Sequence, residues 1–267
     1  MSTLASLMSL EGRTALITGG AGHLGTTIAE TYAELGANLI LVDRDEHALE
    51  RIKQKLVEHW KVSVKTTVCD LENEDQRNML ITEVTSGEER LDILVNNAAF
   101  VGTTGLAGWA VPFEQQTLDT WRRALEVNLT ATFHLSQGFT SLLAKYDCGS
   151  IINIGSIYGE LGPDWALYEG TTMSNPAAYG VSKAGLFQMT RWLATTISPK
   201  IRINAISPGG ISRGQPPEFV NRYTSRTPLK RMAKEDDFKG VAAYLASDAS
   251  SYVTGQIIRV DGGWGIW

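Results

Sequence analysis

The chain alternates short runs of β-branched and other apolar residues with longer stretches in which apolar residues recur at helical spacing. The short runs predict strands, and the longer periodic stretches predict helices. The predicted strands cover Arg13–Thr18, Asn38–Val42, Val62–Val68, Leu91–Val95, Ser150–Ile154, Ile201–Ile206 and Gln256–Val260. The predicted helices cover His23–Leu35, Glu46–His59, Glu74–Ser86, Leu118–Tyr146, Ala177–Ile197 and Lys234–Ser247.

Several of these strands are almost continuously apolar, which is typical of strands covered by helices on both faces of a parallel sheet. Their alternation with helices predicts one α/β domain over residues 1–267, a doubly wound parallel sheet of about seven strands. Three long irregular segments, Phe100–Gln116, Ile157–Pro176 and Ser207–Arg231, follow strands. We therefore expect them to start at the carboxyl edge of the sheet, where open α/β sheets bind ligands.

Composition narrows the class of protein further. With 43% hydrophobic and 20% charged residues, the chain is typical of a globular protein, and its net charge of -5 argues against a nucleic-acid partner. It has no apolar run long enough to span a membrane and no pattern of a secretion signal, so we expect a cytoplasmic protein. Cys69 and Cys148 are expected as reduced thiols. The four histidines show no metal-binding spacing, and no metal is expected.

A glycine-rich turn follows the first predicted strand and leads directly into a helix. The segment runs Thr18-Gly19-Gly20-Ala21-Gly22-His23-Leu24-Gly25. Glycines allow a tight turn and a close approach of the backbone to a pyrophosphate, and the helix N-terminus favours its negative charge. In this strand-to-helix context, the turn predicts a dinucleotide site.

The acidic residue that ends the second strand bears on the choice of dinucleotide. Asp43 follows Gly25 by 18 positions, and a carboxylate there accepts hydrogen bonds from both ribose hydroxyls of an adenosine. It also repels a 2′-phosphate, so NAD is expected rather than NADP. The neighbouring Arg44 leaves NADP open, because an arginine binds a 2′-phosphate well.

A tyrosine and a lysine that carry acid–base chemistry are four positions apart on a predicted helix. Tyr179 and Lys183 share one helix face at this spacing. The lysine ammonium is expected to favour the phenolate and to lower the pKa of Tyr179. The tyrosine then exchanges a proton with an alcohol or ketone oxygen.

Together these motifs make the chain similar to the short-chain dehydrogenase/reductase family over nearly its whole length. The family has a single-domain Rossmann-type fold and a phosphate turn TGxxxGxG, which Thr18, Gly19 and Gly25 match while His23 replaces the middle glycine. The resemblance implies further cofactor contacts by Gly22 and Leu24. By the same resemblance, later cofactor contacts come from Asp70, Leu71, Asn97, Ala98, Ala99, Tyr179, Lys183, Pro208, Gly209, Gly210 and Ile211.

The resemblance also implies the composition of the catalytic centre. Ser156, just past the fifth strand, is similar to the family serine that hydrogen-bonds the substrate oxygen. Asn128, on the preceding helix, is similar to the asparagine that helps to hold a proton-relay water near the lysine. One family position differs: Arg213 stands where the family usually has a threonine that contacts the nicotinamide amide.

The segment between Ser156 and Tyr179 is longer than the family usually has. It is rich in aromatic, acidic and hydroxyl side chains, which suits a polyhydroxylated ligand such as a sugar; packing of these residues onto the body or a neighbouring subunit is the alternative. The residues expected at the substrate are Tyr158, Trp165, Tyr168 and Glu169. Parts of the turn and of this segment also resemble, loosely, a bacterial subgroup linked to flagellin-glycan or sialic-acid-like sugar biosynthesis.

The leading hypothesis is thus an NAD-dependent oxidoreductase that transfers a hydride between nicotinamide and a secondary alcohol or ketone of a sugar-like small molecule. A 3-oxoacyl-carrier-protein reductase-like enzyme and a non-catalytic NAD(P)-binding regulator remain alternatives. The resemblance also implies a homotetramer, with a dimer as the second possibility, through the helices Leu118–Tyr146 and Ala177–Ile197 and the last strand.

Overall fold

The computed structural model describes residues 2–101 and 106–267. Part of the predicted loop Phe100–Gln116, namely residues 102–105, lies outside the described residues. Seven parallel strands form one sheet in the order β3-β2-β1-β4-β5-β6-β7. The strands are β1 (Thr14–Thr18), β2 (Asn38–Asp43), β3 (Val64–Val68), β4 (Ile93–Asn96), β5 (Gly149–Ile154), β6 (Ile201–Pro208) and β7 (Ile257–Val260).

The strand order reverses between β1 and β4, which places a topological switch point there. Ala15 pairs with Ile93 across this junction, and β2 lies on the other side of β1. In open α/β sheets the ligand crevice lies at the carboxyl ends of the strands on either side of such a point. The predicted doubly wound fold is confirmed.

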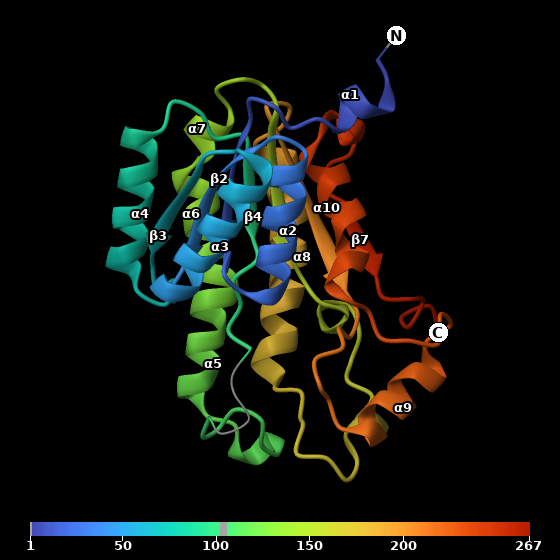
Figure 1. Ribbon diagram of the computed structural model, residues 1–267. Coiled ribbons are helices and arrows are strands. Elements are labelled where there is room, and N and C mark those ends of the chain that lie inside the picture. Colours follow the sequence, from blue (N-terminus) through green and yellow to red (C-terminus); the bar gives the residue numbers. More distant parts are fainter. Residues whose placement is uncertain (1, 102–105) are drawn as a thin grey trace.

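Helices cover both faces of the sheet and bury two apolar cores (Figure 1). The first core lies under α2 (His23–Glu34), α3 (Glu46–Trp60) and α10 (Lys239–Ala246), with Ile28 and Leu245 among its buried residues. The second lies under α4 (Glu74–Gly87), α6 (Ala131–Gly138) and α8 (Ala177–Thr196), with Leu80 and Phe139 among its members. Two-sided burial explains why the strands are so apolar.

The remaining elements lie mainly at the two ends of the sheet. Figure 1 shows α5 (Leu118–Leu125) and α9 (Pro217–Arg226) extending beyond its carboxyl edge, while α1 (Leu4–Met8) and α7 (Thr140–Leu143) lie near the opposite edge. Short 3-10 turns occur at Phe113–Gln115, Ile157–Gly159, Trp165–Tyr168, Glu235–Phe238 and Asp248–Ser250. Within the described residues, no helix is long and apolar enough to cross a membrane.

Two predicted helices differ from the observed ones. The single helix expected over Leu118–Tyr146 is wrong, because α5 passes into a π-helix at Glu126–Thr130 before α6 begins, and α7 ends at Leu143. The helix expected over Lys234–Ser247 begins with a 3-10 turn, and α10 ends at Ala246. The helix α9 lies within Ser207–Arg231, which was expected to be irregular; only Phe219 and Tyr223 of its residues are buried, so its sequence is mostly polar.

Candidate active site

The glycine turn packs so closely that only glycine fits at two of its positions. Gly19 has φ +62°, and a Cβ there would lie 2.9 Å from the Ala98 Cα. A Cβ on Gly25 would lie 2.0 Å from the Gly19 carbonyl oxygen. Gly25 therefore allows α2 to pack against the turn, and Gly22 provides the N-cap of that helix. The backbone N–H groups at the start of α2 are directed as an anion site requires.

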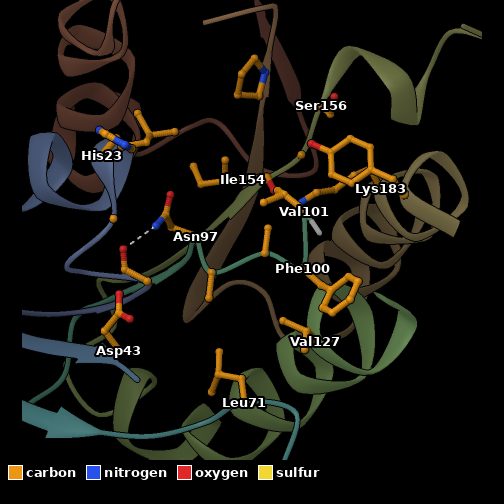
Figure 2. Close-up of a pocket in the computed structure, with 18 of the residues that line it drawn as sticks. His23, Asp43, Leu71, Asn97, Phe100, Val101, Val127, Ile154, Ser156 and Lys183 are labelled. Atoms are coloured by element: carbon orange, nitrogen blue, oxygen red, sulfur yellow. Dashed lines mark hydrogen bonds between the residues drawn. The ribbon is translucent and has the colours of Figure 1, made fainter. Parts of the chain in front are cut away.

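A side-chain amide joins this turn to the end of β4. The Asn97 Nδ2 donates to the carbonyl oxygens of Thr18 at 2.9 Å and Gly19 at 3.0 Å (Figure 2). The Thr18 hydroxyl accepts in return from the backbone N–H groups of Asn97 and Ala98. These bonds fix the two sides of the switch point relative to each other, and with them the floor of the crevice.

A cleft of about 680 Å³ lies along the carboxyl edge, within the usual size range of cofactor sites. Figure 2 shows Ser156 and Lys183 at one end of this cleft, and Asp43 and Leu71 at the other. The expected cofactor and catalytic residues that line it are Gly19, Gly22, His23, Leu24, Asp43, Arg44, Asp70, Leu71, Asn97, Ala98, Ala99, Ser156, Tyr179, Lys183, Pro208, Gly209 and Ile211.

Three other predicted residues do not line the cleft. Gly25 packs against the turn, and Gly210 packs against Tyr223 and Met232. Asn128 lies below the surface with 1% of its area exposed. Among the described residues, no group of three or more His, Cys, Asp or Glu side chains is arranged to bind a metal ion.

Asp43 lies at the expected adenosine end, where its carboxylate is already held by the backbone. One oxygen accepts from the Ala21 N–H at 3.1 Å, and the other from the Arg44 N–H at 2.8 Å. These bonds fix the carboxylate at the end of β2 and leave it facing the cleft. The Arg44 side chain lines the same end and is exposed. Asp43 and Arg44 thus place a carboxylate and a guanidinium next to each other, at a position that fits an adenosine ribose.

Lys183 is held by a backbone oxygen rather than by an acid. Its Nζ donates to the Ile154 carbonyl at 2.8 Å and lies 5.8 Å from the centre of the Tyr179 ring. Only 2% of the residue is exposed. This burial lowers the pKa of Lys183 to about 8, because the charged form loses its hydration.

Burial acts on Tyr179 in the opposite sense and raises the pKa of its phenol. The Ser156 hydroxyl, through a hydrogen bond, and the positive charge of Arg213 both act to lower it. The net shift of the Tyr179 pKa is upward, so the lowering expected from the lysine is not found. Ser156 and Arg213 act in that direction instead.

Asn128 lies in the π-helix, and its side chain ties this element to two others. Its Oδ1 accepts from the Phe100 N–H at 2.6 Å, and its Nδ2 donates to the Ser182 hydroxyl at 3.0 Å. Ser182 immediately precedes Lys183 on α8. A π-helix inside an α-helical stretch is a frequent mark of a functional site, and here it turns the amide toward the end of β4 and α8.

The segment between Ser156 and Tyr179 packs mainly against α9 and the C-terminal tail. The hydroxyl groups of Tyr158 and Tyr168 lie 2.6 Å apart, and Tyr168 also contacts the Phe219 ring. Arg226 forms an ion pair with Asp164, and Arg222 donates to the Glu169 carbonyl. The cleft lining includes none of the four residues expected at the substrate, which are Tyr158, Trp165, Tyr168 and Glu169.

A second cavity of about 490 Å³ is lined in part by this segment. Tyr158 and Trp165 line it together with Phe113 and the α8 residues Val181 and Ala184. The Trp165 side chain is 55% exposed. The sequence predicted a substrate role for residues that the structure places around this second cavity and α9.

The cleft also contains residues that the sequence analysis did not assign. Half of them adjoin an assigned residue along the chain, which is a signal that could have identified them. Arg213 differs from the threonine that the similar family usually has at its position, which is also a signal in the sequence. The unassigned lining residues are Val42, Cys69, Glu72, Phe100, Val101, Leu106, Arg123, Val127, Ile154, Gly155, Arg213 and Gln215.

Comparison with known proteins agrees with this arrangement. The enoyl-(acyl carrier protein) reductase family model matches residues 19–265. A tropinone reductase homolog of Arabidopsis thaliana is 35% identical over 96% of this chain and 93% of its own. A sorbose reductase of Schizosaccharomyces pombe is 32% identical over 98% of this chain and 99% of its own.

Other relatives bear on the alternatives. The 3-oxoacyl-acyl-carrier-protein reductase of Thermotoga maritima is 33% identical over 96% of this chain and 99% of its own. The post-translational flagellin modification protein A of Campylobacter coli is 29% identical over 96% and 100%, respectively. Among solved structures, a gluconate 5-dehydrogenase of Burkholderia cenocepacia in complex with NADP and tartrate superposes with a TM-score of 0.86, at 28% identity over 99% of this chain and 100% of its own.

Proposed function

The chain belongs to the short-chain dehydrogenase/reductase family, and from this premise we propose that it is an NAD-dependent oxidoreductase of a sugar-derived secondary alcohol or ketone. One observation carries the proposal. A single cleft has a carboxylate fixed at the end of β2, Asp43, and, at its opposite end, the half-buried Tyr179 and the buried Lys183.

The protein's own groups can provide the proton chemistry. Bound nicotinamide would supply the acceptor or donor of the hydride. Ser156, which faces the Tyr179 hydroxyl, hydrogen-bonds the reacting oxygen, and Tyr179 takes or gives the proton. Lys183 would contact the cofactor ribose when the cofactor is bound; it would return a proton to Tyr179 after reduction of the ketone, or accept one from it after oxidation of the alcohol. Asn128 positions α8 and the end of β4 around these two residues.

The preference for NAD rests on Asp43. Its carboxylate is fixed by two backbone N–H groups, so it cannot turn away from a 2′-phosphate without losing both bonds. The repulsion would then outweigh the attraction of Arg44, whose exposed charge is screened by solvent. The solved relative with bound NADP shows that the fold also accepts the phosphorylated cofactor.

The choice of a sugar-like substrate is supported by two relatives, a sorbose reductase and a gluconate 5-dehydrogenase. The cleft residues Arg213 and Gln215 add polar groups at the catalytic end. The 3-oxoacyl-acyl-carrier-protein reductase of Thermotoga maritima favours a second candidate function, reduction of a 3-oxoacyl thioester. Intact Ser156, Tyr179 and Lys183 argue against a regulator without turnover.

The test is a spectrophotometric screen of NAD(H) and NADP(H) at 340 nm against sugars, polyols, ketones and 3-oxoacyl thioesters. We expect turnover with NAD(H) and a polyol or keto sugar, and its loss in Tyr179→Phe. Turnover confined to the thioesters would replace the proposal with the second candidate. Equal rates in the wild type and in Tyr179→Phe would contradict the proposed chemistry.

A further inference from the structure

The acidic residues that line the cleft are confined to its adenosine end, where Arg44 and Arg123 also line it. Its acidic lining residues, Asp43, Asp70 and Glu72, all come from the ends of β2 and β3 or the turn after them. The lining residues contributed by β5, α8, β6 and their following turns include no acid; their charged members are Lys183 and Arg213. Among the described residues, the lining of the catalytic end thus has cationic side chains and no acidic one.

Arg213 is brought to this end by the turn that follows β6. Ile206 of β6 pairs with Ile154 of β5, so the two strands deliver their next residues to the same place. The turn is pinned beyond that point, because the Gly210 N–H donates to the Tyr223 hydroxyl at 2.6 Å and Ile211 bridges to Ala233. The Arg213 N–H donates to the Gln215 side chain at 2.7 Å. The backbone of Arg213 is thus fixed beside the catalytic centre.

The guanidinium of Arg213 keeps donors available after its contacts inside the protein. Its Nε lies 3.1 Å from a carboxylate oxygen of Glu235, a residue outside the cleft lining, and the side chain is 42% exposed. Within residues 2–101 and 106–267, its two terminal nitrogens make no hydrogen bond to protein. By contrast, the Lys183 ammonium donates to Ile154. Arg213 also lies near enough to Tyr179 for its charge to act on the phenol.

We propose that Arg213 binds an anionic group of the substrate, a carboxylate or a phosphate ester, while the reacting carbon lies at Ser156 and Tyr179. The planar guanidinium presents paired N–H donors that match both anions in a two-point contact. The substrate class is then an acidic sugar derivative rather than a neutral polyol. This inference rests on the proposed function, since it assigns the substrate of the same cleft.

The geometry argues for substrate over a purely structural pair. A structural arginine in this fold uses more of its donors: Arg231, in the same segment, binds both oxygens of Asp237 at 2.6 Å and 2.7 Å and the Met232 carbonyl. Arg213 pairs with Glu235 through Nε alone, and the residue also lines the cleft. Arg231 is accordingly a matched control, an arginine of the same region paired with an acid outside the cleft.

The experiment compares the wild type with Arg213→Gln, Arg213→Lys and the control Arg231→Gln. Each protein is assayed with NAD⁺ on hexitols, the corresponding hexonic acids and hexitol phosphates. The same compounds are titrated calorimetrically into the NADH-saturated protein, and NADH affinity is measured separately. For Arg213→Gln we expect kcat/KM and binding of the acidic compounds to fall about 10- to 100-fold, the range for lost hydrogen bonds to a charged group. Neutral hexitols and the Arg231→Gln protein should change less than about threefold.

The two classes of acidic compound distinguish a carboxylate from a phosphate ester as the group that Arg213 binds. A loss confined to hexonic acids identifies a carboxylate, and a loss confined to hexitol phosphates identifies a phosphate. Arg213→Lys should recover part of the binding, because it keeps the charge but not the two-point geometry.

Three outcomes would overturn the inference. The first is wild-type binding of hexonic acids and phosphates no tighter than that of hexitols. The second is an equal fall for neutral and acidic compounds in Arg213→Gln. The third is a matching fall in NADH affinity, which would assign Arg213 to the cofactor. Failure of the proposed function is distinct: it appears as absence of turnover on every sugar, while the calorimetric titration still decides the role of Arg213.

Discussion

The Nζ of Lys183 lies 2.8 Å from the carbonyl oxygen of Ile154, the last residue of β5. The bond joins α8 to the strand that leads into Ser156. The acceptor is a neutral carbonyl and not a carboxylate, so its charge does not offset the loss of hydration. Burial therefore lowers the pKa of Lys183 to about 8.

The low pKa of Lys183 predicts that stability rises with pH. The Lys183 ammonium keeps its proton to a higher pH in the unfolded chain, where its pKa is 10.5, than in the folded protein, where its pKa is about 8. Between pH 8 and 10.5 the unfolded state therefore binds more protons, so the free energy of unfolding increases by up to about 3 kcal/mol. Urea unfolding of the wild type and Lys183→Met at pH 7 to 10 measures this. The difference between the two proteins should follow that curve, and parallel pH profiles would contradict it.

Tyr179→Phe should remove turnover while leaving the cofactor site intact. The substitution deletes only the phenol oxygen that faces Ser156. Loss of a positioned acid–base group should lower kcat by about 10²- to 10⁴-fold. Tyr146→Phe, at an exposed tyrosine outside the cleft, is the control. NADH affinity, followed by fluorescence, should stay near wild type in both variants, and a Tyr179→Phe protein that keeps more than about a tenth of kcat would refute the assignment.

Asp43→Asn should shift cofactor preference. The amide keeps a side chain that can bond the Ala21 or Arg44 backbone but loses the charge that opposes a 2′-phosphate. We expect NAD affinity to fall about 10- to 100-fold as hydrogen bonds to a charged acceptor are lost. NADP affinity should hold or improve, since Arg44 remains. Equilibrium titration of both cofactors provides the measurement, with Arg44→Gln as the reciprocal variant. Tighter NADP than NAD binding to the wild type would overturn the preference for NAD.

Asn128→Ala should damage the protein in two ways. It leaves the Phe100 N–H without its partner and removes the donor to Ser182, which should cost about 1–3 kcal/mol of stability. It should also lower kcat more than it raises KM, because the residue positions α8 and does not line the cleft. Chemical unfolding and steady-state kinetics check both parts. Asn78→Ala, on the exposed side of α4, should change neither. An Asn128→Ala enzyme with altered KM alone would place the residue at the substrate.

The strands, the glycine turn and the Tyr179–Lys183 pair could be predicted from the sequence because each depends on residues that are close together along the chain. The inner strands were recognisable because both of their faces are buried. The turn at Gly19 and the Tyr179–Lys183 pair follow from local spacing that the backbone geometry requires. The break at Glu126–Thr130 was not predictable from periodicity, because it depends on Asn128 reaching the Phe100 backbone across the fold. Tertiary contacts of this kind override helical propensity.

The path of the segment after Ser156 was beyond sequence reasoning for a similar reason. Its aromatic and acidic residues suit a sugar pocket in composition. Their partners are instead distant in sequence: Asp164 pairs with Arg226, and Tyr168 contacts Phe219. These contacts come from α9, an element whose mostly polar sequence had been read as irregular. Without α9 in place, the direction in which the segment folds could not be derived.

The exposed Trp165 predicts the role of this segment in assembly. It lines the second cavity with Phe113 and Val181, and all three side chains are exposed next to α8, the helix expected to pair between subunits. Covering such an apolar surface with a second copy of the chain would remove it from water. We therefore expect Trp165→Ala to shift the mass measured by light scattering at micromolar concentration toward smaller species, and to leave NADH affinity unchanged. Tyr252→Ala, at a fully exposed tyrosine outside this cavity, should keep the wild-type mass. If Trp165→Ala instead raises KM at constant mass, the tryptophan belongs to the substrate site; a monomeric wild type would refute the predicted homotetramer and the dimer alike.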